Sequence, residues 1–148
     1  MTYDQNNAFA RILRGDAPCI KVAETEAALA FMDLMPQSDG HVLVIPKEPA
    51  MEIFELSDTA AEACMRMVRC VALAVRTALR PDGIVIAQLN GRAAGQTVGH
   101  VHFHVIPRWT GQRLRPHARV VAEQATLESF AERIRTHLRI HLNDQSNE

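Results

Sequence analysis

The chain has 148 residues, 47% of them hydrophobic, and its 16 basic and 17 acidic side chains leave a formal net charge of −1 at pH 7. This length suits a single domain over residues 1–148 with a core unit over 6–108, large enough to fold without metals or disulfides. The balanced charge gives no basis for binding nucleic acid or an anionic membrane surface. Any phosphate binding must therefore come from a local site.

The cysteines and the N-terminus indicate a compartment. Cys19, Cys64 and Cys70 are odd in number and lack a Cys-x-x-Cys spacing, which argues against a disulfide framework and for a reducing environment. The first ten residues lack the layout of a signal peptide, and no apolar stretch reaches the length of a membrane span. We expect a cytoplasmic protein.

The N-terminal third of the chain predicts a short helix followed by three strands. Phe9, Ile12 and Leu13 have helical spacing, and this helix should end near Gly15. The strands that follow are short and rich in β-branched or small apolar residues. They are expected at residues 20–24, 28–33 and 40–46.

The rest of the chain predicts a long helix, two strands and a last helix. Ser57 can cap a helix that runs to about Leu79 with apolar positions at the 3.6-residue period. A second amphipathic helix is expected over about residues 126–142, with Thr126 as its cap, and the polar residues 143–148 are expected to be disordered. The two strands are expected at residues 84–89 and 101–106.

The order of these elements predicts the fold class. The strands follow one another in runs and do not alternate with helices, which favours an α+β fold over a doubly wound one. We expect a five-stranded antiparallel sheet with one long and two shorter helices.

Three histidines, His100, His102 and His104, alternate with apolar residues. On a strand, alternate side chains point to the same face, so the three imidazoles would share one face while the apolar set enters the core. Histidine titrates near neutrality, so one neutral ring could attack phosphorus while charged neighbours stabilise phosphate oxygens. The pattern favours nucleotidyl transfer, and a metal site or a structural stripe remains open.

A small polar loop precedes the histidines. Gly91 and Gly95 permit a tight path and close approach to a ligand. Gln96 and Thr97 can donate hydrogen bonds, and backbone N–H groups in such turns bind anions. A glycine loop that leads directly into the histidines favours a phosphate site.

The segment Gly95-Gln-Thr-Val-x-His-x-His-x-His-x-Ile-Pro-Arg resembles the signature of the histidine triad (HIT) superfamily. Residues 9–18 resemble the family's N-terminal helix and residues 30–47 its nucleoside-binding strands, so the likeness covers about residues 9–108. It implies a HIT-like fold with the sheet extended across a homodimer, and a reaction at the α-phosphate of a purine nucleotide.

The resemblance also implies roles at the phosphate. His102, the middle histidine, would be the nucleophile that forms a nucleotidyl-histidine intermediate. His100 and His104 would orient that ring and the phosphate, and Gln96 and Thr97 would contact the phosphate.

The nucleoside would lie against residues from earlier in the chain. By the same resemblance, Asp33 would accept hydrogen bonds from the ribose hydroxyls, and Asn90 matches a polar position next to the triad. The base pocket would be lined by Phe9, Ile12, Phe31 and Leu34.

Two departures from the family pattern concern metal binding and the leaving group. Many bacterial members bind zinc through a Cys-x-x-Cys before the N-terminal helix and a histidine after the third strand, where this chain has Asn7, Ala10 and Pro49. We therefore expect no metal and no cofactor. Gly99 stands where the family usually has a larger side chain, which leaves more room on the leaving-group side.

These observations predict a HIT-family hydrolase, with a purine nucleoside phosphoramidase of the Hint-like bacterial branch as the favoured activity. The alternative within the family is a dinucleoside polyphosphate (Ap4A- or Ap3A-type) hydrolase. From other classes, a metal-dependent hydrolase and a non-catalytic nucleotide-binding module remain. No carboxylate is evident near the triad as a metal ligand, which counts against the metal-dependent hydrolase.

Overall fold

The structure is a computed structural model that describes residues 2–144, with side chains placed as far as residue 138. Most of the predicted disordered tail, residues 145–148, lies outside the described residues, whereas 143 and 144 belong to the last helix. The elements are α1 (Ala8–Leu13), β1 (Lys21–Glu24), β2 (Ala28–Met32), β3 (Val42–Pro46), the 3₁₀ turn η1 (Ile53–Glu55), α2 (Asp58–Leu79), β4 (Gly83–Gln88), the 3₁₀ turn η2 (Arg92–Ala94), β5 (Phe103–Arg108) and α3 (Gln124–Asp144).

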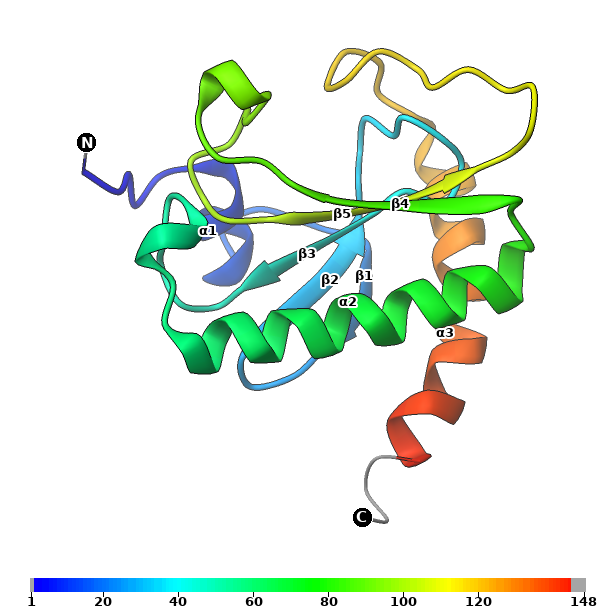
Figure 1. The fold of residues 1–148 in the computed structure, drawn as a ribbon, viewed down its shortest axis with the longest axis horizontal. Helices are drawn as coiled ribbons and strands as arrows, with labels where there is room; N and C mark the ends of the chain where they lie inside the picture. Colours follow the sequence, from blue (N-terminus) through cyan, green and yellow to red (C-terminus); the bar gives the residue numbers. More distant parts are fainter. Residues whose placement is uncertain (1, 145–148) are drawn as a thin grey trace.

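The strands form one antiparallel sheet in the order β1-β2-β3-β5-β4, which confirms the predicted α+β class and the five strands. Figure 1 shows the long helix α2 running beneath the sheet, with α3 at the end of the sheet where β1 lies. The loops before and after β5 rise on the side away from α2.

Both faces of the two central strands are buried. Along β2, Ala30 and Met32 enter the main core beside α2 and α3, whereas Leu29 and Phe31 face the other way. The same alternation runs along β3, because successive side chains of a strand point to opposite faces. The second, smaller apolar cluster consists of Phe9, Leu29, Phe31, Leu43 and Ile45.

The caps of the two long helices differ in how well the sequence predicts them. Ser57 caps α2 as expected, since its Oγ accepts a hydrogen bond from the N–H of Ala60 at 3.2 Å. The prediction that Thr126 caps the last helix is wrong. The N–H of Leu127 already donates to the carbonyl of Glu123, so the helical hydrogen bonding begins before Thr126.

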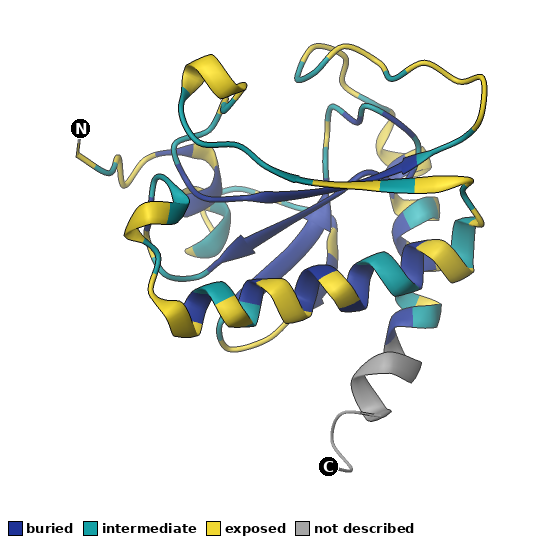
Figure 2. Ribbon diagram, in the orientation of Figure 1, coloured by how far each residue is buried: buried dark blue, intermediate teal, exposed yellow. Residues whose placement is uncertain are grey.

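The edge strand β4 is far more exposed than the other strands. Figure 2 shows it mostly in the colours of exposed and intermediate residues, beside dark-blue β2 and β3. Val85 is 38% exposed and Ile86 50% exposed, and both are apolar. Among the described residues, no helix has both the length and the apolar character to cross a membrane.

Candidate active site

The three histidines do not all lie on a strand, contrary to our prediction. β5 begins at Phe103, because the N–H of Val101 donates to the carbonyl of Ala50 and not to a neighbouring strand. Only His104 is therefore a strand residue. The rings still gather on the side opposite the main core, where the centroids of His102 and His104 lie 5.0 Å apart.

Hydrogen bonds to carbonyl oxygens determine where two of the rings carry their protons. A carbonyl only accepts, so His100 Nε2 donates to Pro46 at 2.8 Å, and His102 Nδ1 donates to the carbonyl of His100 at 2.7 Å. In neutral His102 the lone pair therefore lies on Nε2. In His100 it lies on Nδ1, which accepts a 2.6 Å hydrogen bond from the hydroxyl of Tyr3.

A fourth histidine, His41, orients the third. The backbone N–H of Gln37 donates to His41 Nδ1 at 3.1 Å, which leaves the proton of the neutral ring on Nε2. That atom lies 2.9 Å from His104 Nδ1 and donates to it. The proton of His104 then lies on Nε2, a buried atom with no hydrogen-bond partner among the described residues.

Burial keeps all four rings neutral. It lowers the pKa of His41 to about 3, with His104 adding to the shift, and the pKa of His104 to about 3, with His102 adding. Burial also lowers the pKa of His100 and of His102. These shifts disfavour the positive charge that we expected on the partner rings.

A cavity of about 170 Å³ adjoins the histidines on the face of the sheet opposite α2. It brings together most of the positions singled out in the sequence, from α1, β2, the loop after β2, the loop before β5 and β5 itself. The members that the sequence predicted are Phe9, Ile12, Phe31, Asp33, Leu34, Thr97, His102 and His104.

Asp33 lines this cavity and is held by its own loop. Its Oδ1 accepts a hydrogen bond from the N–H of Met35 at 2.9 Å, and its Oδ2 lies 3.5 Å from His41 Nε2. Burial raises the pKa of Asp33, and the Met35 hydrogen bond opposes that shift.

Three of the predicted residues support the site without lining this cavity. Gln96 accepts from the N–H of Gly91 and donates to the carbonyls of Met51 and Val98, so its side chain fastens the loop. Asn90 accepts from the N–H of Ile53 at 2.8 Å and pairs with Gln88. His100 is fully buried behind His102.

The side chains of Asp33, His41 and His104 offer three possible metal-ligand atoms within 4.8 Å of one another. A carboxylate thus lies nearer to the triad than the sequence suggested. The hydrogen bonding does not fit a metal as it stands. Because the Gln37 N–H occupies His41 Nδ1, His41 Nε2 carries the proton and has no lone pair for a metal.

The N-terminal segment is secured without the cysteines of zinc-binding relatives. Asn7 caps α1, because its Oδ1 accepts from the N–H groups of Phe9 and Ala10 at 3.0 and 2.9 Å. Tyr3 joins the same segment to the triad through His100. The ring of Phe9 in turn lies edge-on to His102, with centroids 5.0 Å apart.

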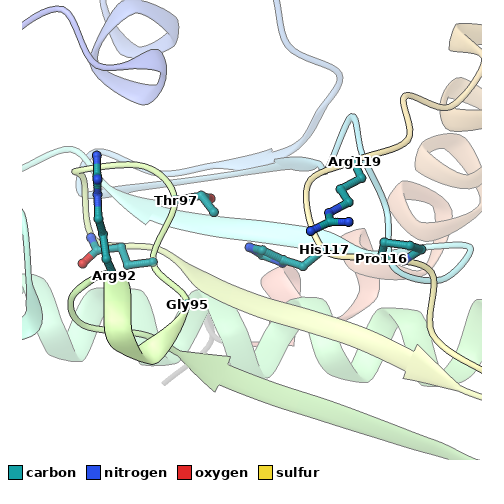
Figure 3. Close-up of a pocket in the computed structure, with 7 residues that line it drawn as sticks. Arg92, Gly95, Thr97, Pro116, His117 and Arg119 are labelled. Atoms are coloured by element: carbon teal, nitrogen blue, oxygen red, sulfur yellow. The ribbon is translucent and has the colours of Figure 1, made fainter.

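A second cavity, of about 680 Å³, opens beside the first and was not predicted. Figure 3 shows Arg92 on the η2 side and His117 and Arg119 on the opposite side, with Thr97 between them. Thr97 and His117 line both cavities. Nothing in the sequence pattern of residues 109–123 pointed to the site, whereas His41, directly after a glycine at the start of a predicted strand, was a detectable signal.

The sequence is similar to a known protein family and to individual proteins within it. The HIT domain family matches residues 14–111. Adenosine 5′-monophosphoramidase hnt1 of Schizosaccharomyces pombe is 47% identical over 100 residues, covering 68% of this chain and 72% of that protein. Adenylylsulfatase HINT3 of Arabidopsis thaliana is 32% identical over 131 residues, covering 84% of this chain and 66% of that protein.

Solved structures of histidine triad proteins are also similar to this chain. A Hit-like protein from Bartonella henselae, solved with an unknown ligand, is 39% identical with a TM-score of 0.88, covering 93% of this chain and 99% of that one. A zinc-bound histidine triad family protein from Mycobacterium smegmatis is 32% identical with a TM-score of 0.80, covering 97% of this chain and 99% of that one. This chain belongs to the HIT domain family.

Proposed function

We propose that this HIT-family hydrolase cleaves purine nucleoside phosphoramidates through a nucleotidyl-histidine intermediate on His102. The observation that carries the proposal is the 2.7 Å hydrogen bond from His102 Nδ1 to the carbonyl of His100. It presents the Nε2 lone pair as a nucleophile in a ring that burial keeps neutral. The names of the S. pombe and A. thaliana relatives, a monophosphoramidase and an adenylylsulfatase, support cleavage next to a nucleotide phosphate.

The reaction would proceed in two displacements. His102 Nε2 forms a bond to the α-phosphorus while the bond from phosphorus to the leaving group breaks, and the leaving group departs with that electron pair. An amine leaving group also takes up one proton. Water then attacks phosphorus, the N–P bond returns its electron pair to Nε2, and the proton that water releases balances the earlier uptake.

His104 and the small cavity would position the substrate. The unpaired Nε2–H of His104 is the donor for a phosphate oxygen or for the leaving atom, and His41 holds that ring in the required tautomer. The apolar wall of the cavity, with Phe9 and Phe31 in edge-on contact, suits a purine base. Asp33 would accept hydrogen bonds from the ribose hydroxyls, and Thr97 would contact the phosphate.

Replacement of the nucleophile tests the proposal. His102→Ala should lower kcat for an adenosine 5′-phosphoramidate by at least about a thousandfold and leave the Kd for AMP within a fewfold, since the nucleophile acts mainly in the chemical step. Single-turnover kinetics and calorimetry measure the two quantities. Substantial turnover by His102→Ala would refute the mechanism. A separate variant, Tyr3→Phe, tests the role of the tyrosine hydroxyl: an unchanged kcat would show that the His100 ring needs no hydroxyl partner.

A metal-dependent hydrolase is the second candidate, supported by the proximity of Asp33, His41 and His104. The two candidates differ in their response to chelation. Attack by His102 needs no Lewis acid, so activity should survive dialysis against EDTA. Loss of activity on dialysis and its return with zinc would favour the metal-dependent reaction.

We further propose a homodimer that extends the sheet across β4, in a reducing, cytoplasmic compartment. The exposed Val85 and Ile86 present an apolar strand edge, which soluble proteins usually cover. Ile86→Lys should convert the dimer to a monomer in light scattering, while Glu26→Lys, on the β1–β2 turn, should not. A monomeric wild-type protein would contradict the dimer.

A further inference from the structure

We propose that the cavity between the η2 loop and residues 116–119 receives the leaving group and selects leaving groups that carry negative charge. The inference rests on the proposed reaction at His102. It assigns a substrate class to that reaction and a role to Arg92 and Arg119, which the triad chemistry leaves unused.

The larger cavity lies where a leaving group would depart. The nucleoside would fill the small cavity lined by Phe9 and Asp33, so the group displaced from phosphorus has to leave on another side. The larger cavity adjoins the small one, because Thr97 and His117 line both. The ring of His117 lies 5.6 Å from that of His104, centroid to centroid, so the larger cavity begins beside the reacting phosphate.

The larger cavity is lined by two arginines whose side chains are available to a ligand. Arg92 and Arg119 make no ion pair or side-chain hydrogen bond with any residue that the structure describes. Arg115, in the same loop, is paired with Asp39 at 2.8 Å. No carboxylate lines the cavity, and the guanidinium groups of Arg92 and Arg119 give it positive charge.

The wall formed by residues 116–119 is held in place. The N–H of Arg115 donates to the carbonyl of Gln37 at 2.7 Å, and the N–H of Ala122 donates to the carbonyl of Leu34 at 2.9 Å. Between them, Ala118 adopts a left-handed backbone with φ of 53°, which is uncommon for a residue with a side chain. This loop therefore presents His117 and Arg119 from a backbone anchored on both sides.

His117 also has an unused polar atom. Its Nδ1 lies 3.4 Å from Gln37 Oε1, whereas its Nε2 is buried without a hydrogen-bond partner in the described part of the chain. A buried polar atom without a partner is costly unless a ligand or water completes it. Because Gln37 Oε1 only accepts, the proton of a neutral His117 ring lies on Nδ1. Its Nε2 would then accept a hydrogen bond from the amine N–H of the leaving group, while the arginines bind the anionic oxygens.

Two matched substrates test the selectivity. Adenosine 5′-phosphoramidates of β-alanine and of β-alaninamide differ in one negative charge on leaving groups of nearly equal size. We expect the wild-type kcat/KM to favour the β-alanine substrate about tenfold or more. Arg92→Gln and Arg119→Gln should each reduce this ratio roughly fivefold, as expected for ion pairs open to solvent. Arg113→Gln, an exposed arginine of the same loop outside the cavity lining, should keep the ratio.

The outcomes separate this inference from the proposed function. Equal kcat/KM for the two substrates, or a ratio that Arg92→Gln and Arg119→Gln leave unchanged, would overturn the charge selection while phosphoramidase activity stands. An equal drop in Arg113→Gln would assign the preference to the overall field and also overturn it. If the wild-type protein turns over neither substrate, the proposed function fails, and this inference fails with it.

Discussion

At the scale of single residues, hydrogen bonds to the backbone determine which atoms of the site can react. His102 and His41 each use Nδ1 for a backbone group, so the reactive or donating atom of each neutral ring is Nε2. His104 receives its orientation from His41, and its own Nε2–H has no hydrogen-bond partner among the described residues. The backbone thus presets the proton positions before any substrate arrives.

Asp33 provides a prediction at this scale. Its carboxylate would accept hydrogen bonds from both ribose hydroxyls, and such charged hydrogen bonds contribute about 1.5–3 kcal/mol. Wild-type protein should therefore bind AMP roughly tenfold or more tightly than 2′-deoxy-AMP. In Asp33→Ala the ratio of the two Kd values should approach one, measured by calorimetry. An undiminished ratio would show that Asp33 does not contact the ribose.

At the scale of secondary-structure elements, the short helix α1 depends on its cap. α1 has only six residues, so its own hydrogen bonds stabilise it little, and Asn7 satisfies two of its N–H groups. The helix contributes Phe9, whose ring contacts both Phe31 and His102. The cap is therefore connected to the nucleoside cavity through one helical turn.

Asn7→Ala should lower the free energy of unfolding by about 1 kcal/mol, the usual loss for a side-chain N-cap. It should also weaken AMP binding more than it lowers kcat, because the displaced Phe9 belongs to the proposed base pocket and takes no part in the chemistry. Urea unfolding and calorimetry measure the two effects. Asn7→Asp, which keeps an accepting oxygen, should restore both, and failure to do so would argue against the capping role.

At the scale of the whole molecule, burial of His41, His100, His102 and His104 makes stability depend on pH. Burial lowers the pKa of each ring below the 6.5 of an exposed histidine. Below pH 6.5 the unfolded chain therefore binds more protons than the folded chain, so stability falls as the pH falls. Each ring contributes up to about 1.4 kcal/mol per pH unit to this loss of stability. Asp33, whose pKa is raised, has the opposite effect on stability, but it is one group against four histidines.

We therefore expect the free energy of unfolding in urea to fall by several kcal/mol between pH 7.5 and pH 5.0. His41→Asn should reduce the slope if the variant folds, and His100→Asn provides an independent second variant, since each removes one of the four groups. Equal stability at the two pH values would contradict burial of neutral rings.

The sequence by itself predicted the approximate positions of the main helices and strands and most of the residues that line the small cavity. Amphipathic periodicity and the Ser57 cap located α2, and β-branched runs between glycine and proline located β3, because these signals are local along the chain. The triad motif and its resemblance to a known family pointed to Phe9, Asp33 and their neighbours, which line one cavity in the structure. The α+β class followed from the grouping of the strands in runs, whereas the strand order β1-β2-β3-β5-β4 was not predicted.

Only the tertiary structure decided the electrostatics of the site and which residues from distant segments contact the triad. The alternation around the triad placed three rings on one strand, but a hydrogen bond from Val101 to distant Ala50 delays the start of β5. The histidines are buried by segments that lie far apart in the sequence, and this burial lowers their pKa values. His117 lies beside His104 because its loop contacts Gln37. Periodicity reports which face of an element is apolar, whereas these contacts join segments separated by tens of residues and leave no local pattern.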